Sequence, residues 1–141
     1  MIFVVSRLRM PSVKHLNSVC HSIAHHAVSG LSFVHPHVLM ACRGAGLDRM
    51  CVNLLDPEPC PERFRDIEPL RLSLGALRSK LEGILAAEGF SLGDLSSAQL
   101  TFAPASQDCD DYSSVCHAVL TSTTGRTYEH TVDYMGTTRH G

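Results

Sequence analysis

The spacing of apolar residues predicts a first amphipathic helix near the start of the chain. From Val13 onward, apolar side chains recur at helical spacing and form one stripe, at positions 13, 16, 20, 23, 24, 27 and 28. Ser12 precedes this stripe and is a favourable N-cap, and Gly30 follows Ser29 at its end. The pattern therefore predicts a helix over residues 13–29.

Two more helices follow from the same kind of pattern. Ser32 can cap a second helix that tolerates Pro36 in its first turn and ends at Gly44 and Gly46. A strand over 38–43 is the alternative for this segment, and we favour the helix. The third helix is expected to start at about Leu70 or Ser73 and to run to Glu88, with an apolar stripe of Leu74, Leu77, Leu81, Ile84 and Leu85.

Strands are predicted between and after these helices. The run 50–55 is apolar apart from Asn53, so it is expected to be buried on both faces and central in the sheet. Residues 98–102 alternate between apolar and polar up to Pro104. Two strands over about 113–122 and 126–135 flank Thr123–Gly125 and form a hairpin.

The hairpin sequence is compatible with two registers. A two-residue loop pairs Val119 with His130 and puts His117 on the same face as His130. A three-residue loop with a bulge pairs Ala118 with His130 and puts His117 on the opposite face. Both registers remain open from the sequence.

Residues 56–69 contain four prolines in fourteen positions, which excludes a helix or an interior strand. We expect an extended surface segment that serves as a lid, a partner surface or a wrap. Taken together, the patterns predict an α+β fold in which about three helices pack on one face of a four-stranded, largely antiparallel sheet.

Composition places this fold in one globular domain over residues 1–141. Residues 1–9 would be a dispensable arm if translation starts at Met10. The 12 basic and 14 acidic residues give a net charge of −2 without a basic cluster, so a nucleic-acid partner is not expected. No signal peptide or membrane span is expected, and six cysteines without a C-x-x-C motif predict reduced thiols in the cytoplasm.

Five of the nine histidines lie between His21 and His37. On the first helix, His21 and His25 share one flank of the apolar stripe, whereas His15 and His26 lie on the other flank. The pair His21 and His25 could therefore clasp zinc, with a third ligand from His35, His37, Cys116 or His117. The segment HSIAH lacks the glutamate of H-E-x-x-H, and we expect no metal or other cofactor.

Other catalytic arrangements find little support in the sequence. Cys20 lies in the middle of the apolar stripe, and Cys116 and His117 are neighbours on a strand and so face opposite sides. The acidic stretch Asp108–Tyr112 lacks the glycine and the terminal glutamate of a calcium loop. No phosphate-binding or nucleophile-elbow motif occurs in the chain.

A partner surface is the remaining candidate. A single helical layer leaves one sheet face open, and Thr127, Glu129, Thr131 and Asp133 form the polar side of the last strand. Its other side would line the core or a pocket with Tyr128, His130 and Tyr134.

From these features we expect a non-enzymatic cytoplasmic protein that self-associates, most simply as a homodimer, or binds a partner or small-molecule ligand. The expected ligand-binding residues are His21, His25, His35, His37, Tyr128, His130 and Tyr134. The alternative is a metal-dependent or histidine-based hydrolase built on His21, His25 and the turn His35-Pro36-His37.

Overall fold

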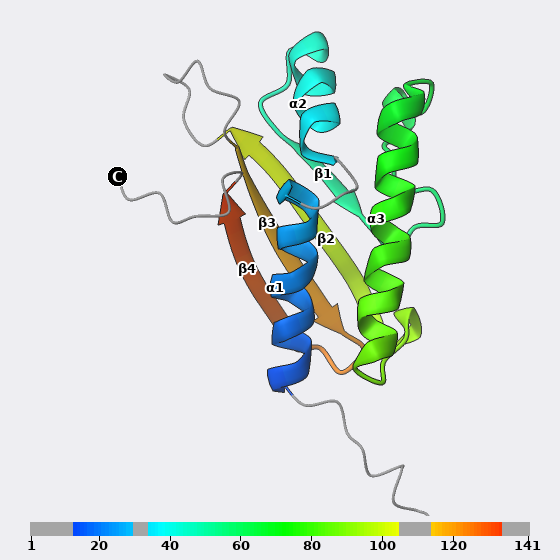
Figure 1. The fold of residues 1–141 in the computed structure, drawn as a ribbon, viewed down its shortest axis with the longest axis vertical. Helices are drawn as coiled ribbons and strands as arrows, with labels where there is room; N and C mark the ends of the chain where they lie inside the picture. The colour runs from blue at the N-terminus through cyan, green and yellow to red at the C-terminus, as the bar shows by residue number, and fades with distance from the viewer. Residues whose placement is uncertain (1–12, 30–33, 105–113, 134–141) are drawn as a thin grey trace, which may run out of the picture.

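A computed structural model describes residues 13–29, 34–104 and 114–133, which form three helices and a four-stranded antiparallel sheet (Figure 1). The predicted α+β class is confirmed. In chain order the elements are α1 (Val13–Ser29), α2 (Val34–Ala45), β1 (Met50–Asn53), the 3-10 turn η2 (Glu62–Phe64), α3 (Glu68–Ala87), the 3-10 turn η3 (Leu92–Asp94), β2 (Leu95–Pro104), β3 (Ser114–Ser122) and β4 (Thr127–Asp133).

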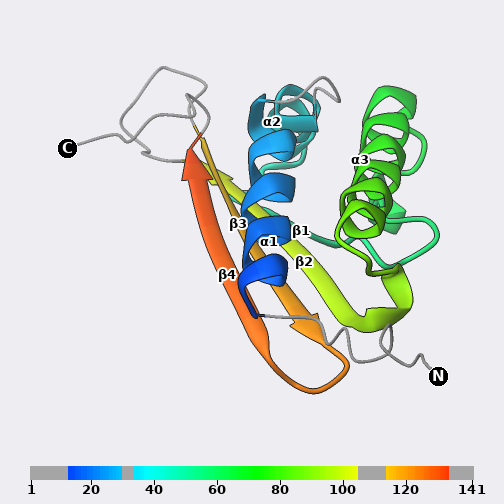
Figure 2. The same cartoon turned by 60° about the horizontal axis from the view of Figure 1, so that its bottom comes forward.

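The sheet has the order β1-β2-β3-β4, and every neighbouring pair is antiparallel. All three helices cover the same face of this sheet (Figures 1 and 2). Because side chains alternate along a strand, one set from each strand meets the helices and the other set lies on the opposite face. Strands β1 and β4 are the two edges of the sheet as far as the described residues show.

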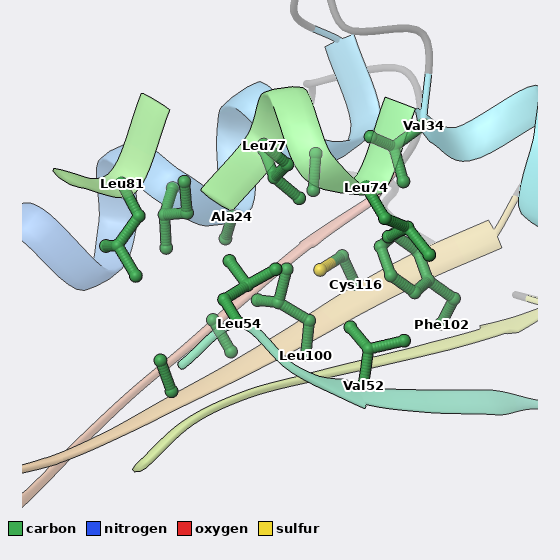
Figure 3. Packing of buried hydrophobic residues seen from close by; sticks show 14 of the residues in the cluster. Ala24, Val34, Val52, Leu54, Leu74, Leu77, Leu81, Leu100, Phe102 and Cys116 are labelled. Carbon is green, nitrogen blue, oxygen red and sulfur yellow. The ribbon is translucent and has the colours of Figure 1, made fainter. Parts of the chain in front are cut away.

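The hydrophobic core fills the space between the helical layer and the sheet (Figure 3). Leucines of α3, including Leu74, Leu77 and Leu81, point toward Leu100, Phe102 and Cys116 of the sheet. All six side chains are at most 1% exposed. The apolar stripes read from the sequence therefore face this core, and burial of such side chains is the main stabilising contribution to the fold.

Helices α2 and α3 decide two points that the sequence left open. Residues 38–43 are helical within α2, and the helix ends at Gly46, whose φ of +72° suits glycine. Helix α3 begins at Glu68, before the predicted start at Leu70 or Ser73. Pro69 lies in its first turn, where a missing N–H and a fixed φ are compatible with the helix.

The prediction that 50–55 forms a central strand buried on both faces is wrong. Strand β1 is short and lies at an edge, with Met50 and Val52 buried but Cys51 exposed. The apolar run includes Cys51, whose side chain faces away from the core. The hydrophobic pattern therefore predicted burial of a face of β1 that is exposed. Asn53 then ends the strand, because its Oδ1 accepts hydrogen bonds from the backbone N–H groups of Leu55 and Ala98, each at 3.1 Å.

The proline-rich segment packs back onto the domain. Pro59, Cys60 and Phe64 are buried, and the Nε of Arg65 donates a hydrogen bond to the carbonyl oxygen of Cys60 at 2.9 Å. Burial of these side chains fits the expected wrap, whereas a role as a lid or a partner surface stays a prediction.

The β3–β4 hairpin uses the three-residue loop, and Ala118 pairs with His130. The N–H of Ser122 donates to the carbonyl oxygen of Arg126 at 2.8 Å, and Gly125 has a φ of +93°. Of the two registers that the sequence allowed, the structure therefore adopts the one that puts His117 and His130 on opposite faces of the sheet.

Candidate functional site

Three histidine rings meet where α1 crosses β4. The ring centroids of His21 and His25 lie 4.4 Å apart with an interplanar angle of 57°, and those of His21 and His130 lie 4.1 Å apart at 85°. His21 is exposed, whereas His25 and His130 are half-buried. We call these three residues the histidine cluster.

The local structure explains why the rings meet. His21 and His25 are one helical turn apart on α1, and the residue before them, Cys20, is fully buried over the sheet. The thiol of Cys20 lies 3.3 Å from the carbonyl oxygen of Tyr128 and 3.5 Å from that of Ala118, which places α1 above β3 and β4. His130 faces α1 because of the hairpin register, and it therefore meets the flank that carries His21.

Burial and mutual repulsion lower the pKa of two members of the cluster. The pKa of His25 is lowered by desolvation first and by the charge of His21 second. The pKa of His130 is lowered by desolvation first and then by His21 and His25. On the other flank of α1, the pKa of His26 is lowered by desolvation and then by Lys80 of α3. Each imidazole therefore favours its neutral form more in the folded chain than in the unfolded chain.

These pKa shifts predict that acid destabilises the fold. A histidine whose pKa is lower in the folded state binds fewer protons than in the unfolded state, so its stabilisation is present above a pH of about 6.5 and is lost as the pH falls through the folded pKa. Urea titrations at pH of about 7.5 and 5.5, where most carboxylates stay ionised, should give a lower free energy of unfolding at the acidic pH. The free energy of unfolding of the variant His130→Gln should fall less between these two pH values than that of the parent chain. An unchanged or higher stability of the parent chain at pH 5.5 would contradict the assignment.

Several predicted site residues lie elsewhere or outside the described ranges. His37 is half-buried in the first turn of α2, and Tyr128 is buried on the helix-facing side of β4, where it belongs to the core. His35 lies in α2, but its side chain is outside the described part, as are Tyr134 and the acidic stretch Asp108–Tyr112. The structure thus brings together His21, His25 and His130 from the predicted set.

The sequence placed His130 in the candidate site, but beside the tyrosines and not beside the α1 histidines. Two separate sequence patterns each placed part of the histidine cluster. Helical spacing put His21 and His25 on one flank of a helix, and strand alternation put His130 on one face of a strand. Nothing in either pattern indicates which helix flank crosses which strand, so only the packing of α1 on β4 joins them.

The zinc hypothesis loses two of its four proposed third ligands. Cys116 is fully buried, and His117 projects from the opposite face of the sheet. Across residues 13–29, 34–104 and 114–133, no group of three or more histidine, cysteine, aspartate or glutamate residues has an arrangement that could hold a metal ion.

The buried thiols are poorly suited to nucleophilic chemistry. Burial raises the pKa of Cys20 to about 11 and that of Cys116 to about 12, so both are protonated at neutral pH. The five cysteines in the described ranges, which include the exposed Cys51, are all free. No disulfide joins any two of these five, reduced thiols stay a prediction, and Cys109 lies outside the described residues.

A second polar group on the open sheet face was not found from the sequence. The Nδ1 of His117 lies 2.7 Å from the Oγ1 of Thr131, and its Nε2 lies 3.3 Å from a carboxylate oxygen of Glu129. The hydroxyl, imidazole and carboxylate are connected as in a catalytic relay. However, the His117 and Glu129 side chains are 41% and 60% exposed, so water competes for every contact. We interpret the group as a cross-strand interaction on a solvated face.

The outer edge of β4 runs beside the histidine cluster. The bond from Ser122 to Arg126 fixes the alternation of the β3–β4 ladder, in which Tyr128, His130 and Val132 direct their backbone groups toward β3. The N–H and C=O groups of the alternate positions 127, 129, 131 and 133 therefore point away from β3. In the part of the chain that the structure describes, no strand pairs with this edge.

Two further observations bear on the class of protein. Among the helices of the described ranges, none is long and apolar enough to cross a membrane. No protein-family model, curated protein or solved structure matches this chain.

Proposed function

We propose that this protein is a non-enzymatic, self-associating module that forms a homodimer through the outer edge of β4 and the adjoining flank of α1. The observation that carries the proposal is the outer edge of β4, which lies beside the histidine cluster without a pairing strand among the described residues. The unpaired backbone groups of such an edge can be satisfied by a strand from a second copy.

The sequence of β4 carries few of the features by which proteins protect an exposed edge. Lysine, proline and β-bulges are the usual means, and TYEHTVD contains neither residue. From the pair Val115–Asp133 to the pair Thr121–Thr127, the β3–β4 register is also continuous. Glu129 and Asp133 are the charged residues of the strand, and the register of pairing decides whether they repel each other.

Strand pairing between two copies would also bring together the neighbouring flanks of α1. In an antiparallel pair related by a two-fold axis perpendicular to the sheet, the helical layers of both copies lie on the same side. Figure 2 shows that α1 covers β3 and β4. The two α1 helices would therefore be neighbours across the axis. This contact adds side-chain burial to the backbone hydrogen bonds.

The hydrolase alternative has weaker support from the geometry. The thiol beside the cluster, Cys20, is fully buried, and its raised pKa keeps it protonated. The Thr131–His117–Glu129 group is on the open face, opposite to the histidine cluster. A shared active site for these groups would need them on one face of the sheet.

Sedimentation equilibrium at neutral pH tests the proposal directly. We expect a concentration-dependent mass that approaches twice the 15.4 kDa of the chain. Thr131→Pro should give a folded monomer, because proline removes an outward N–H of an edge strand that the β3–β4 ladder does not use. Thr131→Val removes the hydroxyl but keeps the N–H, and it should still dimerise.

Circular dichroism identifies any variant that fails to fold. A parent chain that stays monomeric at all accessible concentrations would refute the proposed function. A Thr131→Pro variant that is folded and dimerises like the parent would place the interface away from the edge of β4.

A further inference from the structure

We propose that two copies pair β4 with β4 in a single register centred on His130, and that protonation of the histidines that meet there separates the dimer. This inference rests on the proposed function and adds the geometry and the regulation of that interface.

Backbone alternation limits the possible registers to a few. Because the outward groups belong to positions 127, 129, 131 and 133, a symmetric antiparallel pair must match these odd positions with one another. We name each register by its central residue, which lies opposite the same residue of the second copy. Registers centred on Glu129, His130 or Thr131 satisfy the condition and pair the largest number of residues.

Charge distinguishes among the three registers. Centring on Glu129 places that carboxylate opposite its own copy, and centring on Thr131 places Glu129 opposite Asp133. Both arrangements put like charges directly across from each other, which destabilises a strand pair. Centring on His130 pairs Glu129 with Thr131 and Thr127 with Asp133, so no like charges oppose each other. This register is the electrostatically complementary one.

The favoured register also brings the two histidine clusters together. His130 would face His130 of the second copy as a non-hydrogen-bonded pair, whose Cα atoms are about 4.5 Å apart in antiparallel sheets. Both rings project to the side of the sheet that the helices cover. In each copy, the ring centroids of His21 and His130 lie 4.1 Å apart there, and those of His21 and His25 lie 4.4 Å apart. Six imidazoles would therefore gather around the two-fold axis.

The titratable groups around His130 determine the direction of the pH response. From α1, His21, His25 and the Cys20 thiol face this region, and from the helix-facing sides of β3 and β4 come Cys116 and Tyr128. The carboxylate of Glu129 projects from the opposite face, toward His117. Among the described residues, none of these facing groups is a carboxylate, so charged His21 and His130 imidazoles of the two copies repel one another across the axis. Release of the second copy relieves this repulsion.

The dissociation constant should therefore rise on acidification. For each proton that the dimer takes up when it dissociates, the dissociation constant increases about tenfold for every pH unit by which the pH falls. Between pH of about 7.5 and 5.5, we expect a rise of at least roughly tenfold in the parent chain. His130→Gln removes the central pair of imidazoles and should give a markedly smaller rise.

Sedimentation equilibrium of the full chain with Thr131→Lys and Thr131→Glu tests the register. Both variants lose the hydroxyl that contacts His117, so they are matched in that respect. With His130 at the centre, residue 131 opposes Glu129 twice per dimer, so the lysine variant should bind at least roughly tenfold more tightly than the glutamate variant. A register centred on Glu129 makes the two variants equal, because residue 131 then opposes Thr127. A register centred on Thr131 weakens both.

The outcomes separate the two proposals. If the parent chain is monomeric, the proposed function and this inference both fail. If it dimerises but the two Thr131 variants do not differ in the expected direction, the dimer stands and the His130-centred register is wrong. If the dissociation constant does not rise at pH 5.5 while circular dichroism shows folded protein, or if His130→Gln responds as the parent does, the histidine switch is wrong.

Discussion

Replacement of Leu74 by alanine is expected to lower the free energy of unfolding by about 2–5 kcal/mol, the largest effect that we predict for a single change. Leu74 is fully buried in the middle of α3 and points toward the sheet at Phe102 (Figure 3). Its truncation removes apolar burial and leaves a cavity that the helix and the sheet cannot fill without moving. Urea denaturation followed by circular dichroism measures the loss.

Leu72 provides a matched control on the same helix. Its side chain is 57% exposed, so Leu72→Ala makes the same chemical change where little burial is lost. We expect a change within about 0.5 kcal/mol. If Leu72→Ala and Leu74→Ala destabilised the protein equally, α3 would not pack on the sheet by the face that the structure shows.

Replacement of Gly125 by alanine is expected to destabilise the protein by about 1–2 kcal/mol. Its φ of +93° lies in the region that disfavours a side chain, although no heavy atom lies within 4 Å of the added Cβ among the described residues. The cost is therefore one of backbone conformation and not of steric contact. Thermal and urea denaturation of the variant should both show it.

Gly83 of α3 is the matched control for that change. It has no positive φ, and an added Cβ meets no described heavy atom within 4 Å. Alanine there should stabilise the helix by about 0.5–1 kcal/mol, because it reduces the conformational freedom of the unfolded chain. The same glycine-to-alanine change should thus have opposite signs at the two positions. A stabilising effect at Gly125 would argue against the three-residue hairpin loop.

The conformation of Gly125 also matters for the candidate site. The loop that it closes determines that Ala118 pairs with His130, and a slip by one residue would turn His130 to the other face of the sheet. His130 would then leave His21 and join the side that carries His117. The histidine cluster therefore depends on the hairpin as well as on α1.

The sequence by itself determined the local elements. The spacing of apolar residues predicted all three helices and the hairpin, and the residues 13–29 of the first helix match α1. The same spacing identified Cys20 as a core residue and His21 with His25 as neighbours on one flank. These features are local, because helical and strand periodicity fix which nearby residues share a face.

Tertiary structure decided everything that depends on which elements meet. The edge position of β1 could not be derived, because an outward-facing cysteine and a buried one contribute equally to an apolar run. The hairpin register required the loop conformation around Gly125, since one-residue alternatives fit the sequence equally well. The meeting of His130 with His21 required the packing of α1 over β4, 109 residues apart along the chain, and no periodicity in the sequence carries information over that separation.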